Sequence, residues 1–174
     1  MRYCAFLRGI NVKGTSMKMV DVVNIFNEAG LNDVSSVLAT GNILFSSDKS
    51  SLDLKLILEE KLEDKFHFKC FLFIKNKQEV DDILKHNPFQ KHANFNIYCC
   101  IVEKEKDSML IDEYLKYTTS QEEEVHLKEG IIYWKVKKGS TLNSVFGKIL
   151  GLKKFKDLFT SRNMNTIEKI SIKL

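Results

Sequence analysis

Proline and glycine are scarce in this sequence, which has one proline and eight glycines in 174 residues. The scarcity excludes a proline- or glycine-rich linker, and 44% hydrophobic residues with charges of both signs exclude a disordered chain. Apolar runs near the roughly 20 residues that span a bilayer are also missing. The N-terminus lacks the basic and apolar stretches of a signal peptide. We expect a cytoplasmic protein without membrane contact, folded around one large core or two smaller ones.

Metal and disulfide signatures are missing as well. The four cysteines show no C-x-x-C spacing, and the four histidines have no metal-ligand spacing with them. Cys99 and Cys100 are adjacent in a strand-like run, where neighbouring side chains point to opposite faces and cannot form an ordinary disulfide. With Cys4 and Cys70 in similar apolar runs, we expect four buried, reduced thiols. The sequence predicts no metal and no cofactor.

Arginine is rare, with three arginines against 24 lysines. The planar guanidinium of arginine binds carboxylate or phosphate through two hydrogen bonds, so its few positions carry information. Arg8 ends a predicted strand, and Arg162 lies in a predicted turn with Ser161 and Asn163. The two arginines either share an anion site or hold loops in place. Residues 130–174 are also basic, with ten Lys and Arg against two Asp and Glu, which favours either an anionic partner or lysine-rich exposed helices.

Hydrophobic periodicity predicts strands and helices in the order β-α-β-β-α-β for the first half of the chain. Gly30 suits a left-handed helix C-terminus, Gly41 lies in a hairpin turn, and Ser50 with Asp53 forms a helix N-cap. A short helix opens at Asn76. The predicted strands are Tyr3–Leu7, Asp33–Ala39, Ile43–Ser47 and Phe68–Ile74, with helices between Met19 and Gly30 and after Ser50.

The second half repeats this order as β-α-β-β-α, ending in a helical extension rather than a strand. The predicted elements are strand Phe95–Val102, helix Ser108–Tyr117 with Asp107 as its cap, strands Glu124–Lys128 and Ile131–Val136 around Glu129-Gly130, and helix Thr141–Leu150 after Ser140. The fold class is therefore α+β: two ferredoxin-like halves packed as one body, with mostly antiparallel sheets and helices on one face of each. Pro88 is the predicted boundary, giving halves 1–88 and 89–174.

A glycine-rich segment, residues 9–16, follows the first strand and precedes a helix. It has the glycine spacing of a phosphate-binding loop, but Gly14 is followed by Thr15 rather than the lysine that a Walker A loop requires. Backbone N–H groups at the next helix N-terminus, with Thr15 or Ser16, remain able to receive an anion.

Four segments together resemble a known family. These are Leu7–Val12, Thr40–Phe45, Asn87–Phe89 and Thr160–Thr166, and they resemble the bacterial family catalogued as domain of unknown function 1697. The resemblance implies a compact α+β protein of unassigned activity. This sequence departs from the family pattern at three positions. Lys13 stands where the family usually has glycine, Thr40 where it often has serine, and Met164 where it usually has tryptophan.

The resemblance emphasises a set of polar residues that we take as candidate ligand-binding residues: Arg8, Gly9, Asn11, Gly14, Gly41, Asn42, Arg162, Asn163 and Thr166. Such residues bind and orient a ligand well but supply no acid or base. No G-x-S-x-G turn is present, and no histidine lies in these segments. We predict a protein that binds a small anionic or nucleotide-like ligand, with Arg8 and Arg162 on one surface.

Other functions remain open. One alternative is a nucleic-acid-binding accessory protein that uses the basic C-terminal half, where aromatic residues interleave with lysines; their spacing fits core positions better. These aromatic residues are Tyr133, Trp134, Phe146, Phe155 and Phe159. Another alternative is an enzyme that acts on a phosphorylated substrate, although no catalytic residue is identified. A homodimer formed through a sheet edge is also open.

Overall fold

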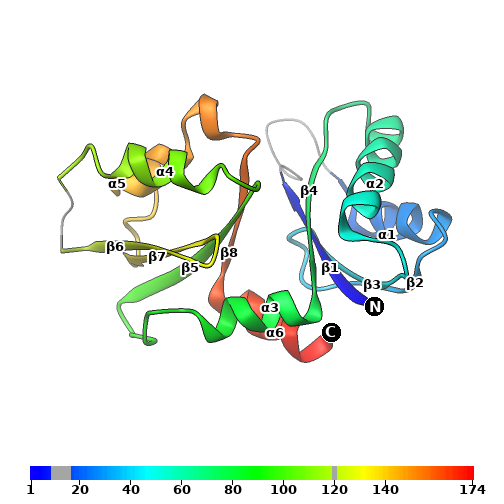
Figure 1. Cartoon of the computed structure of the whole chain (residues 1–174), viewed down its shortest axis with the longest axis horizontal. Helices are drawn as coiled ribbons and strands as arrows, with labels where there is room; N and C mark the ends of the chain where they lie inside the picture. Colours follow the sequence, from blue (N-terminus) through cyan, green and yellow to red (C-terminus); the bar gives the residue numbers. More distant parts are fainter. Residues whose placement is uncertain (9–16, 119–120) are drawn as a thin grey trace. The chain divides into compact units, whose positions relative to one another are not determined.

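The structure, a computed structural model, describes residues 1–8, 17–118 and 121–174. It divides into two units (Figure 1), the first of Met1–Asp81 with Glu168–Leu174, the second of Asp82–Ile167. The divisions fall inside two helices, α3 (Lys77–Lys85) and α6 (Met164–Lys173), so each helix contributes residues to both units. The predicted boundary at Pro88 stays a prediction.

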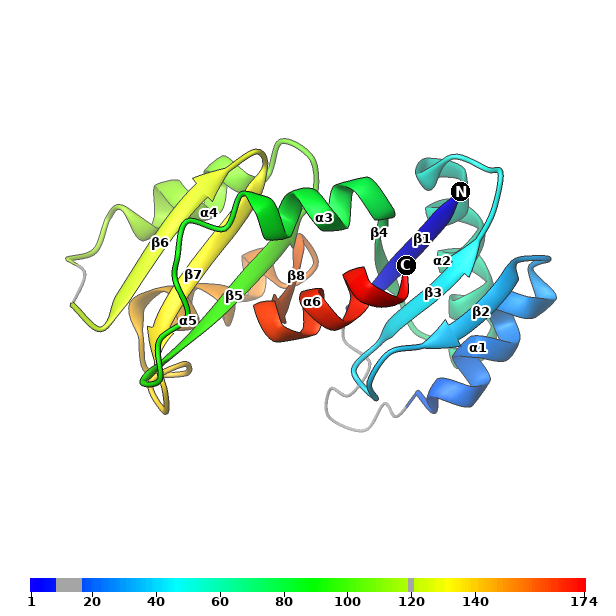
Figure 2. The same ribbon diagram turned by 90° about the horizontal axis from the view of Figure 1, so that it is seen from below.

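The first unit contains a four-stranded antiparallel sheet of order β2-β3-β1-β4. Figure 2 shows β2, β3 and β1 side by side. The chain order is strand, helix, strand, strand, helix, strand, which is the ferredoxin-like plan. The elements are β1 (Arg2–Arg8), α1 (Met19–Glu28), β2 (Asn32–Ser36), β3 (Asn42–Ser46), α2 (Ser51–Phe66) and β4 (Phe71–Asn76).

One face of this sheet forms the core with α1 and α2. Alternate residues of β1, including Tyr3, Ala5 and Leu7, join Phe26 and Leu58 from the helices in one buried cluster. The caps of α2 and α3 agree with the sequence. Ser50 Oγ accepts a hydrogen bond from Asp53 N (3.1 Å), and Asn76 Oδ1 accepts one from Glu79 N (2.9 Å).

Hydrogen bonds outside the core join α2 to β4, and α6 to α3, in the first unit. At the outer edge of the sheet, the Glu59 carboxylate of α2 accepts a hydrogen bond from Leu72 N of β4 (2.7 Å). The Asp81 carboxylate of α3 accepts hydrogen bonds from Lys77 Nζ and from Ser171 Oγ of α6, each at 2.6 Å. These contacts connect α2 to β4 and the end of α6 to α3.

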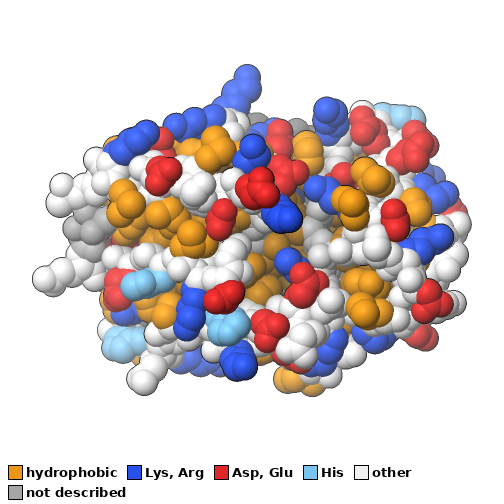
Figure 3. Space-filling view, viewed as in Figure 1, with side chains coloured by type: hydrophobic (Ala, Val, Ile, Leu, Met, Phe, Trp, Pro, Cys, Tyr) orange, Lys and Arg blue, Asp and Glu red, His pale blue; other side chains and the backbone are white. Residues whose placement is uncertain are grey.

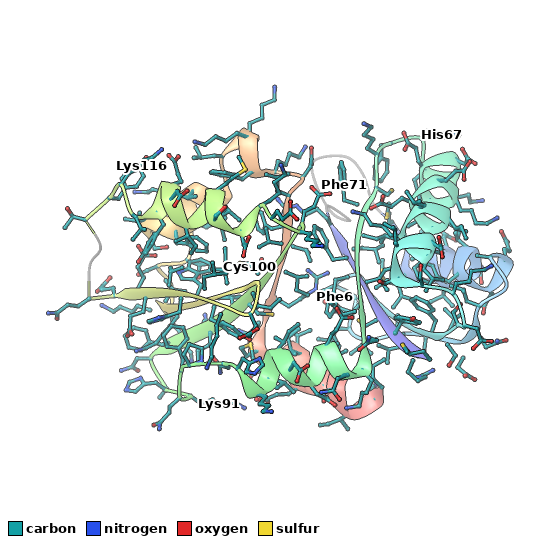
Figure 4. The ribbon with its side chains drawn as sticks, viewed as in Figure 1. Phe6, His67, Phe71, Lys91, Cys100 and Lys116 are labelled. Atoms are coloured by element: carbon teal, nitrogen blue, oxygen red, sulfur yellow. The ribbon has the colours of Figure 1, made fainter. Side chains whose placement is uncertain are left out.

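The second unit has the same chain order and an equivalent sheet of order β6-β7-β5-β8, also antiparallel. Its core contains Cys100, Trp134 and Phe146, and Figure 4 labels Cys100 within this unit. The prediction of two ferredoxin-like halves is confirmed. The elements are β5 (Phe95–Val102), α4 (Asp107–Tyr114), β6 (Glu123–Lys128), β7 (Ile131–Lys137), α5 (Val145–Leu150), the 3-10 turn η1 (Lys153–Phe155) and β8 (Phe159–Asn163), before α6.

The prediction that no strand follows α5 is wrong, because β8 completes the second sheet. β8 is an edge strand in which only Phe159 and Thr160 are buried. Its last residues, Ser161, Arg162 and Asn163, are polar and show no apolar alternation. Pairing with β5 therefore determines the extended conformation here, and local sequence does not reveal it.

The two helices of the second unit also differ from prediction at their starts. α5 begins at Val145 rather than Thr141, with Ser144 as its N-cap in place of Ser140. A Cβ at Gly147 would lie 1.8 Å from Thr141 O, so glycine is required where the 141–144 turn packs on the helix. α4 begins with Asp107 itself, after Lys106, and shows no side-chain cap.

The structure reveals a residue-level repeat between the units. β1 carries Tyr3-Cys4 and β5 carries Tyr98-Cys99. Cys4 pairs with Lys75 of β4, as Cys99 pairs with Arg162 of β8. The next residue in each case is an asparagine that starts a helix: Asn76 before α3 and Asn163 before α6. Lys75-Asn76 and Arg162-Asn163 thus occupy equivalent positions.

Candidate functional site

One end of the first sheet brings two of the family-like segments together. Leu7 N donates a hydrogen bond to Gly41 O (2.8 Å), and the neighbouring residue Phe6 pairs with Asn42. Arg8, the last residue of β1, is therefore next to the turn that joins β2 to β3. Arg8 is partly exposed and Thr40 of that turn is exposed. A cation and a hydroxyl therefore belong to neighbouring segments at this end of the sheet.

The turn itself explains why Gly41 and Asn42 occur there. Gly41 has φ +73°, in the left-handed region that favours glycine. Asn42 is fully buried, and its Nδ2 donates hydrogen bonds to Val37 O (2.9 Å) and Thr40 Oγ1 (3.0 Å). The amide of Asn42 thus holds the turn and the Thr40 hydroxyl in place. Gly9, Asn11 and Gly14 lie outside the described residues.

The second unit contains Arg162, Asn163 and Thr166 at the junction of β8 and α6. Arg162 NH1 donates hydrogen bonds to Thr160 Oγ1 (2.7 Å) and to Ser161 O (2.8 Å). Asn163 Oδ1 accepts a hydrogen bond from Asn165 N (2.9 Å) at the start of α6. Thr166 is the third residue of that helix and partly exposed. A guanidinium, an amide and a hydroxyl are therefore close together along the chain at a helix N-terminus.

The junction of β8 and α6 can be compared with the equivalent junction of β4 and α3 in the first unit. In the first unit, Lys75 forms an ion pair with Glu79 at 2.8 Å. Glu79 lies three residues after Asn76, and Thr166 lies three residues after Asn163. The second unit has a neutral threonine where the first has a carboxylate, and an arginine where the first has a lysine. At these equivalent positions the second junction therefore carries one negative charge fewer than the first, and its cation is an arginine.

The thiols fit a structural role. All four cysteines are free and buried, as expected. Burial raises the pKa of Cys70 to about 11, with further contributions from Glu63 and Glu59. Burial likewise raises the pKa of Cys99 to about 12, although the nearby Arg162 charge opposes the rise. Protonated thiols are poor nucleophiles. Among the described residues, no three His, Cys, Asp or Glu side chains are grouped to hold a metal.

The aromatic residues of the basic C-terminal half belong to the core. Tyr133, Trp134, Phe146, Phe155 and Phe159 are each at most 3% exposed. This confirms the expectation from their spacing, and none of them presents a ring for stacking. On the face that Figure 3 shows, basic and acidic side chains are interspersed. Within the described part of the chain, no helix has the length and apolar character needed to cross a membrane.

Comparison with known protein families identifies the family of this chain. The family described as "Protein of unknown function (DUF1697)" matches residues 1–133. The chain belongs to this family. The DUF1697 match includes the Arg8 and Thr40–Asn42 segments and ends before β8 and Arg162. No curated protein matches the sequence.

A solved structure shares the fold of this DUF1697 protein. It is the conserved bacterial protein SP0830 from Streptococcus pneumoniae, with a TM-score of 0.80, 22% identity, and coverage of 99% of this chain and 97% of the other. At this identity the likeness concerns the fold alone.

The structure brings together Arg8 with Gly41 and Asn42, and Arg162 with Asn163 and Thr166. The prediction that Arg8 and Arg162 share a surface joins residues of the two units and stays a prediction. Sequence reasoning missed the equivalence of Lys75 and Arg162. The signals that reveal it are the repeated Tyr-Cys in β1 and β5 and the repeated cation-Asn before α3 and α6.

Proposed function

We propose that this protein binds a small anionic ligand, such as a phosphate-bearing metabolite. Arg8 and the Thr40 turn supply one set of binding groups in the first unit. Arg162, Asn163 and Thr166 supply another in the second unit. Gly9, Asn11 and Gly14 remain part of the proposal because they lie in the segment that begins immediately after Arg8.

The hydrogen bond from Leu7 N to Gly41 O carries the proposal. It joins two segments that are about 30 residues apart in sequence and that both match the family. Arginine, threonine and backbone groups at one sheet end are groups that bind phosphate or carboxylate. Asn42 supports them by holding Thr40, with 3.0 Å between Asn42 Nδ2 and Thr40 Oγ1.

The chemistry of the described residues favours binding over catalysis. The thiols of Cys70 and Cys99 have raised pKa values, and the polar side chains at both segments are guanidinium, amide and hydroxyl groups rather than carboxylates or imidazoles. An enzyme acting on a phosphorylated substrate stays an alternative that turnover would reveal. Nucleic-acid binding has less support, because the five C-terminal aromatic side chains considered for stacking are buried. A cytoplasmic location and a homodimer also stay predictions.

The test is a thermal-shift panel of inorganic phosphate, phosphorylated metabolites, nucleotides and short RNA and DNA, at low and moderate salt. A ligand at about 100 times its dissociation constant adds about 2.7 kcal/mol of stability, a shift of several degrees in a protein of this size. We expect a salt-tolerant shift from a small anion that Arg8→Ala abolishes.

Arg2→Ala is the matched control. Arg2 lies on the same strand and the same sheet face as Arg8, at the opposite end, where it donates hydrogen bonds to Asp33 O, Ser46 Oγ and Lys173 O. Each variant's shift is measured from its own unliganded midpoint. Equal loss in Arg2→Ala and Arg8→Ala would contradict a site at the Arg8 end. Shifts from RNA or DNA alone, steeply reduced by salt, would favour nucleic-acid binding instead.

A further inference from the structure

We propose that the ligand is a nucleotide and that its base stacks on Phe71, beside Arg8. This inference rests on the proposed anion site and adds the chemical class of what it binds. Phe71 was not among the residues that the sequence suggested.

The pairing of β1 with β4 brings Phe71 to the anion site. Arg8 and Phe71 are directly opposite each other in the antiparallel register, at the end of both strands. Side chains of directly opposite residues lie on the same sheet face, with Cβ atoms about 4.5–5.5 Å apart. The side chains of Arg8 and Phe71 therefore start from neighbouring positions on the same face of the sheet. The Thr40 turn is on the other side of Arg8, as the Leu7–Gly41 bond shows.

Burial along this face singles out Phe71. The next pair inward on the same face is Phe6 with Phe73, which are 0% and 8% exposed. Phe71 is only partly buried, and β4 is the edge of the sheet, so Phe71 has a neighbouring strand on one side only. Phe6 and Phe71, both labelled in Figure 4, are next in sequence to the core residues Leu7 and Leu72, so they lie on the opposite face of the sheet from α1 and α2. Exposure therefore increases along this face from the buried Phe6 and Phe73 rings to the partly buried Phe71.

A second cation reaches the same aromatic row. Lys55 Nζ, from α2, lies 5.8 Å from the centroid of the Phe73 ring and 3.9 Å from the Glu59 carboxylate. Lys55 therefore lies over the ring next to Phe71 in the same row, and its charge is offset by the Glu59 carboxylate. A flat ring next to an arginine suits a ligand with both an aromatic base and a phosphate. A sugar phosphate or inorganic phosphate would use the arginine and leave the ring unused.

The experiment measures dissociation constants by calorimetry for inorganic pyrophosphate, ribose 5-phosphate and the nucleoside 5′-phosphates of the four common bases. We expect at least one nucleotide to bind about 5- to 150-fold more tightly than ribose 5-phosphate, the range expected for one base stacked on an aromatic ring. Phe71→Leu, which keeps apolar volume without a ring, should remove this advantage. Phe71→Tyr should retain it.

Phe68→Leu is the position control, because Phe68 is also partly buried but packs on the core side of the same unit. It should leave the nucleotide advantage unchanged. In NMR spectra of the bound nucleotide, the base protons should show upfield ring-current shifts with wild type and Phe71→Tyr, and lose them with Phe71→Leu.

The outcomes separate the two proposals. If ribose 5-phosphate binds as tightly as every nucleotide, and Arg8→Ala weakens both, the anion site stands and the stacking inference is overturned. If the nucleotide advantage survives in Phe71→Leu, the base binds elsewhere and the inference is again overturned. If none of the probes binds, or Arg8→Ala has no effect on binding, the proposed function fails and the inference fails with it.

Discussion

The two units have one fold but distribute their charged groups differently. In the first, the helix that follows the second hairpin strand is capped locally, by Ser50. In the second, α5 is capped by Ser144 and also by a buried carboxylate, Glu123, from strand β6. At the other repeated position, Lys75 is paired with Glu79, whereas Arg162 is followed by Thr166. Equivalent positions in the two units therefore carry polar side chains of different chemistry. Where the side chains differ, a substitution in one unit should affect stability or ligand binding in a way that has no counterpart in the other unit.

Removing Glu123 should give the largest effect. Glu123 is 4% exposed, and its carboxylate accepts hydrogen bonds from Val145 N (2.8 Å), Phe146 N (3.2 Å) and Trp134 Nε1 (3.3 Å). Glu123→Ala would leave these buried donors without their acceptor, at a cost of about 3 kcal/mol. Trp134 is the single tryptophan, so its fluorescence during urea unfolding follows the second unit directly.

Two comparisons sharpen this result. Glu124→Ala, the adjacent exposed residue that pairs with Lys135, should cost less than about 1 kcal/mol. Ser50→Ala, which removes the local cap of α2, should cost about 1 kcal/mol and leave the Trp134 transition in place if the units unfold separately. A loss of similar size in Glu123→Ala and Glu124→Ala would show that the buried cap has no special role.

Converting the second junction to the charge of the first tests the anion proposal. Thr166→Glu places a carboxylate where the first unit has Glu79, near Arg162, and should weaken anion binding about tenfold, or 1.4 kcal/mol. A glutamate in the first turn of a helix favours folding, so the variant should remain folded. The readout is the dissociation constant of the best ligand from the thermal-shift panel.

Asn165→Glu is the charge-matched control for this substitution. It adds the same charge one residue earlier, at an exposed position of α6, and should weaken binding less. Arg162→Lys gives the second unit the cation of the first and should also weaken binding, because lysine lacks the two-donor fork. Unchanged affinity in both Thr166→Glu and Arg162→Lys would remove this junction from the proposal.

Lowering the pH should have the smallest effect on the free energy of unfolding. Each unit contains one carboxylate whose pKa is lowered in the folded state: Asp81 in the first and Glu113 in the second. Hydrogen bonds from Lys77 and then Ser171 lower the pKa of Asp81 below its ordinary value of 3.8. Hydrogen bonds from Lys154 and Lys116 likewise lower the pKa of Glu113 below 4.5. A lowered folded-state pKa stabilises the fold above the ordinary value, and this contribution is lost as pH falls through the folded value.

The measurement is the free energy of unfolding from about pH 6 down to about pH 2 for wild type and Asp81→Asn. The Asp81 side chain is 39% exposed, so solvent screening should limit its contribution to less than about 1 kcal/mol. The variant's curve should be flatter at acid pH than that of wild type. Parallel curves would mean that Asp81 does not titrate differently in the folded and unfolded states.

Local patterns predicted the elements whose residues determine their own conformation. The apolar run at Tyr3–Leu7, the Ser50 cap and the Asn76–Glu79 capping box are all short-range signals, and the structure contains each of them. The two ferredoxin-like halves followed from the order of such elements. β8 was missed because its polar residues become a strand only through pairing with β5, about 60 residues away in the sequence.

The site was predictable only in part, for a related reason. Family-like residues drew attention to Arg8, Gly41 and Arg162, but sequence could not show that the Asn42 amide holds the Thr40 turn or that Asn163 caps α6. Phe71 gave no signal, since an aromatic residue in a strand is ordinary core composition. Its interest arises from register with Arg8, which depends on how β1 and β4 align.

The contact between Glu59 and Leu72 N has a consequence for the behaviour of the protein at high concentration. β4 is an edge of the first sheet, and a free edge N–H is a template for strands of other molecules. The Glu59 carboxylate accepts a hydrogen bond from this donor at 2.7 Å, so Leu72 N is not available to a strand of another molecule. Glu59, which joins α2 to β4, should therefore also disfavour aggregation through the edge of this sheet.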